Sequence, residues 1–425
     1  MSIVEHAPKF DLDSASRLAR DLYSLEASAI CLPSERDQNF LLETASGERF
    51  VLKMANATEE RTMLEAQNRV MDHLSKHIDL CPEVIPAKNG EEITIAESEN
   101  GANHFVRLVT YLPGTPLGKV KRRSPALLHD LGTKIGQLDV ALQGFDHPTL
   151  HRDFHWDLAN GLSIIRRNAG LIGDTELRGL VTKLADEFEK NTTPLLPKLR
   201  TSVIHNDAND YNILVGGGSD LYSRNQSVVG LIDFGDMVHS YTVSDLALAI
   251  AYAILDQPNP LSVASQIVRG YHSAFPLFED EISVVFGLVT LRLCQSVAVA
   301  AEQQKLQPEN DYLGISQQSI RKSLPELAKI PSRLAEAVFR EACGLTPVRS
   351  SPYITDWLRE HADEFGPVLE PDIRTNPVVV LDLNMGSPLL SADPARRFHP
   401  FPRPATGAWT FRGRPRRTTG FSRIP

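Results

Sequence analysis

The amino-acid sequence predicts an α+β protein with two lobes, a small antiparallel β-rich N-lobe over residues 1–112 and a larger, mainly helical C-lobe over residues 113–345. Two observations lead to this prediction. Strand-like runs surround one long helical pattern before Leu112, and helical periodicity dominates after Pro116. A length of 425 residues, with 42% hydrophobic and 23% charged residues, is ordinary for a folded chain of two or three folding units.

The predicted N-lobe is a small antiparallel sheet crossed by one main helix. A short helix at Ser14–Leu22 precedes the strand-like runs, which are Ala27–Leu32, Asn39–Glu43, Arg49–Met54, Glu92–Ala96 and His104–Tyr111. The tripeptide at residues 45–47, Ala-Ser-Gly, suits a hairpin turn between the second and third runs. Apolar residues recur at helical spacing from Thr58 to His77, and Thr58 is a candidate N-cap.

The predicted C-lobe is built mainly of helices. Helical patterns occupy Leu127–Gln143, Thr175–Glu189, Leu261–Phe275, Ile282–Gln304 and Ile315–Ala342. Two strand-like runs, Asn212–Val215 and Ser227–Ile232, interrupt them. The stretch Ile282–Ala301 is close to membrane length, but polar residues including Arg292 interrupt it, so we expect a buried core helix. A β-rich lobe followed by a helical lobe predicts a ligand-binding cleft at their junction.

Two polar loops carry the strongest chemical signal. They are HNDANDYN at residues 205–212 and DFGD at residues 233–236, and an apolar strand precedes each. Phosphoryl transfer needs positioning and cations more than covalent help. Asp207 would orient the acceptor hydroxyl and take its proton, whereas the oxygens of Asn212 and Asp233 suit Mg²⁺. This signal is specific because two independent motifs occur in the right order. The structural alternative is that both loops are turns capped by aspartate and asparagine.

The N-lobe offers a candidate cation for the phosphates of a nucleotide. Lys53 ends the run FVLK at residues 50–53, and Glu65 on the following helix is the candidate to hold Lys53 by an ion pair. Glu59 and Glu60 compete for this role, but they lie in the first turn, where acidic residues favour the helix dipole.

The nucleotide site lacks a glycine-rich loop. The turn after the first strand reads PSERDQN at residues 33–39. Phosphate contacts there would have to come from Ser34, Gln38, Asn39 or backbone amides. The segment from Val109 to Leu112, which includes Tyr111, is the expected hinge, where main-chain groups can pair with a purine edge.

Other acidic residues are weaker candidates for substrate binding. Asp210 and Asp236 could bind an ammonium group or cap a turn, and Asp245 is expected to tie down the catalytic loop. A second loop, HRDFHWDLAN at residues 151–160, is excluded as the catalytic centre, because its asparagine follows Asp153 by seven residues instead of five and no strand–DFG unit follows. Asp153 could line the acceptor pocket, or its segment could pack a helix end.

These residues resemble a known superfamily. Lys53, Glu65, the H-x-D-x4-N pattern at residues 205–212 and DFGD at residues 233–236 are similar to the aminoglycoside phosphotransferase and choline kinase superfamily. The resemblance covers roughly residues 10–345 and implies a protein-kinase-like bilobal fold, with Mg²⁺ as cofactor and ATP or GTP as phosphoryl donor. One departure is Asn206, where the superfamily often has glycine.

Within this superfamily the chain looks most like the hydroxylysine kinases. The similar segments are DQNF at residues 37–40, HRDFxW at 151–156, NDxNILV at 209–215 and DFGDM at 233–237. This implies phosphoryl transfer to the hydroxyl of a hydroxy-amino acid or amino-alcohol, above all 5-hydroxylysine, a small cationic substrate. The module is also similar to the kinase part of bacterial proteins that continue into an aminotransferase, and residues 377–390 look like the start of such a continuation. An aminotransferase is therefore a candidate partner.

Two alternative functions stay open. One is an antibiotic-modifying kinase, which for aminoglycosides needs a larger acidic pocket. The other is a non-catalytic nucleotide-binding module that serves an aminotransferase. Such a module is disfavoured by the joint presence of Lys53, Asp207, Asn212 and Asp233.

Composition and charge narrow the partners and the compartment. A formal charge of −9 argues against nucleic acid as a partner. Four widely spaced cysteines and an N-terminus without an apolar run predict a cytoplasmic protein with no membrane partner. Residues 346–425 are expected to be an extension, disordered in part, and residues 394–425 hold eight arginines and no acidic residue.

Overall fold

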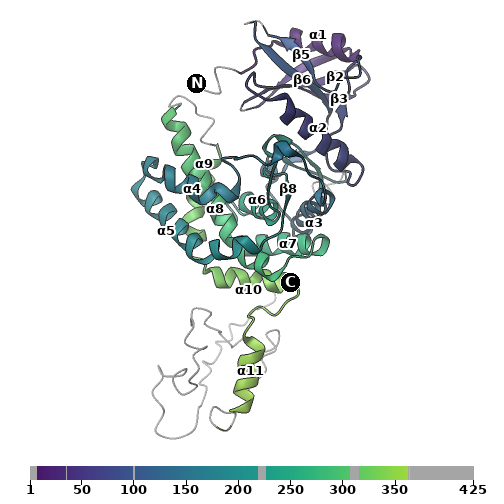
Figure 1. The fold of residues 1–425 in the computed structure, drawn as a ribbon. Helices are drawn as coiled ribbons and strands as arrows, with labels where there is room; N and C mark the ends of the chain where they lie inside the picture. The colour runs from purple at the N-terminus through teal and green to yellow at the C-terminus, as the bar shows by residue number, and fades with distance from the viewer. Residues whose placement is uncertain are drawn as a thin grey trace, which may run out of the picture. The chain divides into compact units, whose positions relative to one another are not determined.

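A six-stranded antiparallel sheet forms the N-lobe of the computed structural model (Figure 1), which describes residues 7–34, 36–98, 101–218, 226–306, 315–361 and 363. The strand order is β1-β2-β3-β6-β4, and β5 also pairs with β6. The strands are β1 (Ala27–Leu32), β2 (Gln38–Thr44), β3 (Arg49–Met54), β4 (Val84–Ile85), β5 (Thr94–Glu97) and β6 (Asn103–Thr110). The predicted N-lobe sheet is confirmed. The short β4 was not predicted, because two residues carry no readable alternation.

Helix α1 (Leu12–Tyr23) covers the N-lobe sheet. Asp11 caps it, since its side chain accepts a hydrogen bond from the Ser14 N–H at 2.7 Å. Ala15, Ala19 and Tyr23 are buried and pack in one cluster with apolar residues of β2, β3 and β6. This cluster is separate from the main core of the protein, so α1 and the sheet have a small core of their own.

Helix α2 (Arg61–Ser75) joins the N-lobe to the main core. Its buried residues Met63, Val70, Met71 and Leu74 belong to the same apolar cluster as the large C-lobe helices. The prediction that Thr58 caps this helix is wrong, because the helix starts three residues later and the Thr58 hydroxyl donates to Asn56 Oδ1 at 2.9 Å.

The C-lobe is mainly helical, and two small sheets carry its polar loops. Its helices are α3 (Pro125–Leu142), α4 (Leu158–Asn168), α5 (Thr175–Asn191), α6 (Val243–Ala253), α7 (Pro260–Ala274), α8 (Glu279–Leu306), α9 (Ile315–Leu327) and α10 (Ser332–Ala342), and one more helix, α11 (Ser351–Glu360), lies in the predicted extension. One sheet has the order β10-β9-β7, and the other pairs β11 with β8. These strands are β7 (Thr115–Pro116), β8 (Thr201–Ile204), β9 (Ile213–Gly216), β10 (Ser227–Leu231) and β11 (Val238–Tyr241). The predicted α+β architecture is confirmed, and the lobe boundaries at 112 and 345 stay predictions.

One predicted helical stretch is divided in two. The pattern at residues 315–342 forms α9 and α10, and Pro331 occupies the N-cap position of α10. Proline lacks the N–H that a continuous helix needs, and it disfavours helical backbone at the residue before it.

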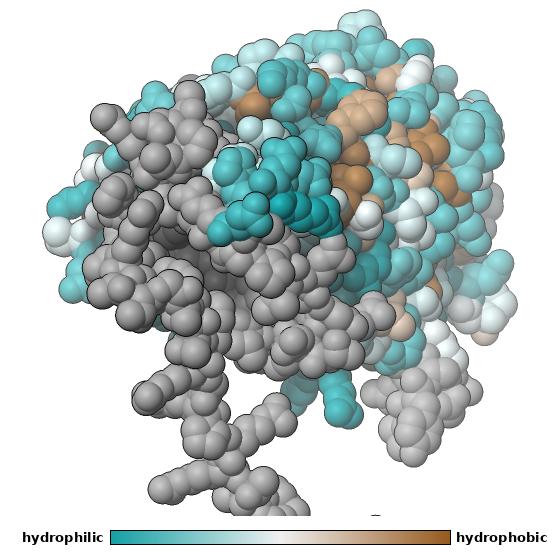
Figure 2. Space-filling model, turned by 90° about the horizontal axis from the view of Figure 1, so that it is seen from below, coloured by the Kyte–Doolittle hydropathy of each residue, from teal (hydrophilic) through white to brown (hydrophobic). Residues whose placement is uncertain are grey.

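The most apolar helix, α8, is a core element. Among the residues that the structure describes, Glu279–Lys305 is long and apolar enough to cross a membrane, but 89% of its most apolar window is buried inside the protein. The prediction of a buried helix is therefore confirmed. On the face drawn in Figure 2 the described residues are mainly hydrophilic, and hydrophobic residues gather in small groups.

Two features of the predicted extension lie outside the described residues. They are the possible aminotransferase-like start at residues 377–390 and the arginine-rich segment at residues 394–425.

Candidate active site

The predicted catalytic loop leads from β8 to β9, and a buried aspartate on α6 fixes its start. The backbone N–H groups of His205 and Asn206 donate to the Asp245 carboxylate at 2.8 and 2.7 Å. Asp245 is itself fully buried in the C-lobe. The prediction that Asp245 ties down this loop is therefore confirmed.

Two residues of the polar loops adopt a left-handed backbone conformation. The φ angle is +62° at Asn206 and +67° at Asp233. Asparagine and aspartate tolerate this region better than most residues. Asn206 also donates from Nδ2 to the backbone oxygen of Asp236 at 3.1 Å, which glycine could not do. Asn206 thus takes a backbone conformation that favours glycine and adds a tie between the two loops.

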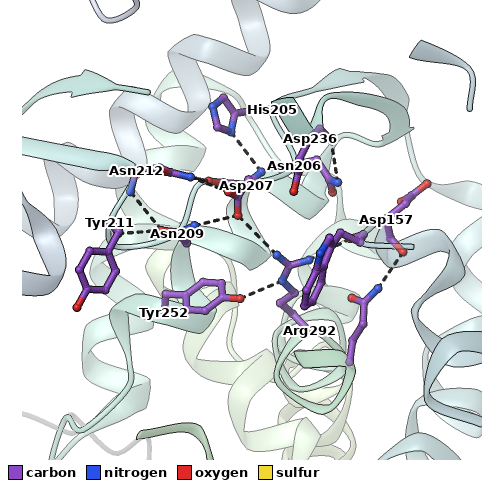
Figure 3. Close-up of polar contacts among 12 residues, drawn as sticks. Asp157, His205, Asn206, Asp207, Asn209, Tyr211, Asn212, Asp236, Tyr252 and Arg292 are labelled. Carbon is purple, nitrogen blue, oxygen red and sulfur yellow. Dashed lines mark hydrogen bonds and ion pairs between the residues drawn. The ribbon is translucent and has the colours of Figure 1, made fainter. Parts of the chain in front are cut away.

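Asp207 lies at the centre of a hydrogen-bond network (Figure 3). Asn209 Nδ2 donates to Asp207 Oδ1 at 2.9 Å, and Asn212 Nδ2 donates to Oδ2 at 2.6 Å. Asn209 is held in turn, because its Oδ1 accepts from the backbone N–H of Tyr211 at 2.8 Å. The two amides fix the direction of the Asp207 carboxylate, whose side chain is 17% exposed.

Arg292 of α8 is a site residue that the sequence analysis did not identify. Its Nη2 lies 3.6 Å from Asp207 Oδ1. The guanidinium stacks on the Trp156 ring at 4.5 Å, donates to the Trp156 backbone oxygen at 3.0 Å, and donates to the Tyr252 hydroxyl at 3.2 Å. The sequence contained one signal for Arg292, which is a lone arginine within an apolar helix. Because a buried charge needs a partner, such an arginine indicates an acidic or polar group nearby.

The surroundings of Asp207 make it a stronger base than a free carboxylate. Burial and the negative charges of Asp236 and Asp233 raise the pKa of Asp207 well above its usual value, whereas Arg292 and the bond from Asn209 act in the opposite direction. A higher pKa improves proton acceptance as long as the group stays ionised at the working pH. Arg292 therefore limits the rise in the pKa of Asp207.

Lys53 and Asp233 meet from different lobes. Lys53 Nζ on β3 lies 3.9 Å from Asp233 Oδ1, with side chains 20% and 57% exposed, so the pair remains open to a ligand. Asn39 is the partner of Lys53 in the β2–β3 register, which puts the two side chains on one face of the sheet. Asn39 Oδ1 is buried and has no hydrogen-bond partner among the described residues.

The predicted metal ligands are hard oxygen donors, which fit Mg²⁺. The Asn212 backbone oxygen accepts from the Ile232 N–H at 3.0 Å, so Asn212 lies beside the chain that leads into Asp233. The Asn212 side-chain nitrogen is committed to Asp207, which leaves Oδ1 for a cation. In the described part of the chain, no three His, Cys, Asp or Glu residues are grouped to hold a metal. Phosphate oxygens and water would have to complete the ligand set.

The prediction that Glu65 holds Lys53 is wrong. Glu65 Oε1 accepts from Arg61 Nε at 2.9 Å, one turn earlier on α2, and its side chain is 42% exposed. Glu65 lines a cavity together with Arg61 and Arg69 of α2 and residues 90–93.

A buried arginine instead fixes α2 to the sheet. Arg107 on β6 is the register partner of Lys53 and donates to Gln67 Oε1 at 2.7 Å and Asn68 Oδ1 at 2.8 Å. Arg107 and two neutral amide side chains therefore make the contact between the sheet and α2. Lys53 instead forms its ion pair with Asp233.

The structure also contradicts the assignment of Val109 as a main-chain partner for a purine. Val109 lies in register with Val51 of β3 on one side and Val84 of β4 on the other. The N–H and C=O groups of Val109 therefore point toward a neighbouring strand, either β3 or β4. The Tyr111 N–H donates to the Arg49 backbone oxygen at 3.3 Å, so only its carbonyl stays a candidate. Ser34 is exposed in the β1–β2 loop and stays a prediction.

Three predicted substrate-binding carboxylates already have partners. Asp210 Oδ2 lies 3.7 Å from Arg123 Nη2, and both side chains are largely buried, which favours a structural role, and substrate binding by Asp210 stays a prediction. Asp236 Oδ1 accepts from Arg36 Nη2 at 2.9 Å. Asp153 Oδ1 accepts from Asn160 Nδ2 at 2.8 Å, which favours the helix-end interpretation of its segment.

The segment around Asp153 supports the catalytic loops from behind. Arg152 Nη2 donates to the backbone oxygens of Gly235 and Met237, both at 2.9 Å, and its guanidinium stacks on Phe154 at 4.2 Å. The same segment includes Trp156, which holds Arg292 beside Asp207, so it supports both the DFGD loop and the surroundings of Asp207.

A large cavity lies away from this site. Its volume is about 410 Å³, and Phe188, Phe286 and Arg333 are among the residues that line it between α5, α8 and α10. The ligand-binding cleft expected at the lobe junction stays a prediction.

Comparisons with known proteins agree with this arrangement. The model of the phosphotransferase enzyme family matches residues 32–280. The hydroxylysine kinase of Danio rerio is 32% identical over 342 residues, which cover 78% of this chain and 94% of that protein. Among solved structures, a microcompartment-associated aminopropanol kinase superposes with a TM-score of 0.58 at 19% identity, covering 80% of this chain and 100% of that one. An amicoumacin kinase, in complex with AMP-PNP, Ca²⁺ and Ami, has a TM-score of 0.57 at 13% identity, covering 76% of this chain and 96% of that one.

Proposed function

Because the chain belongs to the phosphotransferase enzyme family, we propose that it transfers the γ-phosphoryl group of ATP or GTP to the hydroxyl of 5-hydroxylysine. The observation that carries this proposal is the convergence of Lys53 and Asp233 from different lobes beside the oriented carboxylate of Asp207. The similarity to hydroxylysine kinases over 94% of a relative's length supports the choice of acceptor.

Asp207 is the proposed general base. The carboxylate is held by Asn209 and Asn212, so it can receive the proton of an acceptor hydroxyl without reorganising. The Arg292 guanidinium lies 3.6 Å from one carboxylate oxygen and opposes the rise in the pKa of this base. Positioning of this kind is the main contribution that a protein makes to phosphoryl transfer.

Asn212 and Asp233 are the residues that would hold Mg²⁺, and Lys53 is the proposed phosphate-binding cation. When bound, the ion neutralises charge on the phosphates of the donor. Asp233 carries the only carboxylate of this pair, and its half-exposed side chain leaves room for other ligands.

A cationic acceptor fits the charges around the base. The negative charges of Asp233 and Asp236 raise the pKa of Asp207, and an ammonium group on the acceptor would offset this repulsion. We place the enzyme in the cytoplasm, where both nucleotides are available.

The test is an acceptor screen with the purified full chain. 5-Hydroxylysine, simple amino-alcohols, homoserine and kanamycin are each incubated with Mg·ATP or Mg·GTP, and release of nucleoside diphosphate is followed. We expect turnover with 5-hydroxylysine and none with kanamycin. Turnover with kanamycin alone would favour the antibiotic-modifying alternative, and absence of turnover with every acceptor would favour a non-catalytic module.

A further inference from the structure

An arginine in the loop between β1 and β2 reaches the DFGD loop. Arg36 Nη2 donates to Asp236 Oδ1 at 2.9 Å, across a separation of 200 residues in the sequence. The same Nη2 lies 3.7 Å from the position that a Cβ on Gly235 would occupy, so the guanidinium lies directly over this loop. Arg36 therefore extends from the segment in which the sequence analysis found no glycine-rich phosphate loop.

The backbone that carries Arg36 is anchored next to the strand of Lys53. Asn56 Nδ2 donates to the Arg36 backbone oxygen at 3.2 Å, and the Asn56 N–H donates to Asp37 Oδ1 at 3.0 Å. Asn56 follows the end of β3 by two residues. Two cations, Arg36 and Lys53, are thus presented from one edge of the N-lobe toward residues 233–236.

The two members of this ion pair differ in freedom. The Arg36 side chain is 42% exposed and can change its position, whereas the Asp236 side chain is 15% exposed. An almost buried carboxylate is costly without a cationic partner. The nearby Arg152 does not serve, since it donates to the backbone oxygens of Gly235 and Met237. When Arg36 leaves, Asp236 needs another cation.

We propose that Arg36 exchanges partners during the reaction: it moves from Asp236 to the phosphates of the bound nucleotide, and the released Asp236 then binds an ammonium group of the acceptor. A guanidinium binds phosphate oxygens through two parallel hydrogen bonds, which suits a loop without glycines. Donor binding thus creates the cation site for the acceptor, and binding is ordered, with the nucleotide first. This proposal rests on the proposed function and names Arg36 and Asp236 as residues that couple its two substrates.

The coupling is tested by calorimetry on the full chain. Binding of 5-hydroxylysine is measured with and without AMP-PNP and Mg²⁺, and nucleotide binding is measured alone. In the wild-type protein we expect 5-hydroxylysine to bind about tenfold or more tightly in the presence of AMP-PNP. Equal affinity with and without nucleotide would overturn the exchange.

Variants separate the two halves of the proposal. Arg36→Ala should weaken AMP-PNP binding about 10- to 100-fold and make 5-hydroxylysine binding independent of nucleotide. Asp236→Asn should have the opposite effect on the donor, because Arg36 is no longer held back: AMP-PNP binds more tightly while the KM for 5-hydroxylysine rises. A merely structural ion pair would give weaker or unchanged nucleotide binding in both variants, and this result would contradict the proposal.

A matched control is Arg20→Ala, which removes an exposed arginine of the N-lobe whose ion pair with Glu26 lies on α1 and the loop after it. Its AMP-PNP affinity should equal that of the wild type. If no variant and no condition gives 5-hydroxylysine binding, the proposed acceptor fails, but the nucleotide measurements on Arg36→Ala and Asp236→Asn still decide the role of Arg36.

Discussion

Asp207 depends on residues that are distant from it in the sequence. Its pKa is raised by burial and by neighbouring carboxylates, and Arg292 is the cation that opposes this shift. Because Arg292 is 3% exposed and held by Trp156 and Tyr252, it acts on the base from behind rather than on the substrate. Arg292 is thus a positioning residue for the proposed reaction.

Removal of this charge should change the pH profile. In Arg292→Met the pKa of Asp207 rises further, so the fraction of ionised base at a given acidic pH falls. The acid limb of kcat/KM should therefore move to higher pH by about one pH unit. The pH–rate profile measures this directly, and Arg292→Lys, which keeps the charge, should shift the limb less. An unmoved limb in a folded Arg292→Met protein would show that Arg292 does not act on the base.

Local sequence motifs were enough to predict candidate site residues on the two polar loops and on β3. Lys53, Asp207, Asn212 and Asp233 were predicted from local patterns, and the structure brings them together. The partner of Glu65 could not be predicted in this way, because it depends on which face of α2 carries Glu65, and there Glu65 bonds to Arg61.

Two helices of the C-lobe cross in direct backbone contact. A Cβ on Gly132 of α3 would lie 1.9 Å from the Ile267 backbone oxygen, and a Cβ on Gly270 of α7 would lie 1.9 Å from the His129 backbone oxygen. These glycines allow the helices to approach as closely as they do, and the crossing places α3 and α7 around the buried Asp139 and Tyr271.

Gly132→Ala should therefore destabilise the protein. The new methyl group forces the two helices apart, at a cost of about 2–3 kcal/mol in the free energy of unfolding. Chemical denaturation measures this change. Gly179→Ala on α5 is the control, since nothing lies within 4 Å of its Cβ position, and it should be neutral or stabilise by up to about 1 kcal/mol. Equal effects of the two substitutions would contradict the close crossing.

A buried acidic pair links three helices behind the catalytic loop. Tyr271 donates to Asp139 Oδ2 at 2.5 Å, and the charge of the nearby Asp245 acts on Asp139. Burial and the charge of Asp245 raise the pKa of Asp139 well above its usual value, and burial raises the pKa of Asp245 to about 6. Both carboxyl groups therefore keep their protons to a higher pH in the folded protein than in the unfolded chain.

Substitution of Asp139 should remove a pH dependence of stability. The folded state keeps protons that the unfolded state loses above pH 4, so this pair's contribution to stability is full at low pH and declines as pH rises through about 6 and beyond. Asp139→Asn keeps an acceptor for the Tyr271 hydroxyl and removes one of the two titrating groups. Denaturation at pH 5 and pH 8 should show the variant gaining on the order of 1 kcal/mol over the wild type at the higher pH. A constant difference between the two proteins would contradict the raised pKa of Asp139.

Periodicity predicted the long elements well and the short ones poorly. The strands β2 and β3 and the helix α8 were predicted, because each has several turns or alternations to read. The strands β4, β7 and β11 have two to four residues, and their existence depends on partners elsewhere in the chain.

A bound nucleotide would contact both lobes of the protein. Lys53 with Asp233 and Arg36 with Asp236 each join an N-lobe residue to the DFGD loop. A ligand that binds only the folded protein stabilises it by mass action. Both lobes should therefore be stabilised together when a nucleotide is present.

Thermal unfolding should report this linkage. Mg·ATP or Mg·GTP at 100 times its Kd should add about 2.7 kcal/mol to the free energy of unfolding. Asp233→Ala should abolish most of this gain, because it removes the carboxylate that would hold the ion, and chelation of Mg²⁺ should have the same effect on the wild type. A full nucleotide-dependent gain in Asp233→Ala would show that Asp233 is not part of the nucleotide site.

We expect Asp207 to act on the acceptor and not on the donor, and one substitution separates the two roles. Asp207→Asn preserves the size of the side chain but removes the proton acceptor. Single-turnover phosphoryl transfer to 5-hydroxylysine should slow by about 10²–10⁴-fold, while the Kd for Mg·AMP-PNP stays within error of the wild type. Undiminished transfer, or a loss of transfer fully explained by lost nucleotide binding, would contradict the assignment.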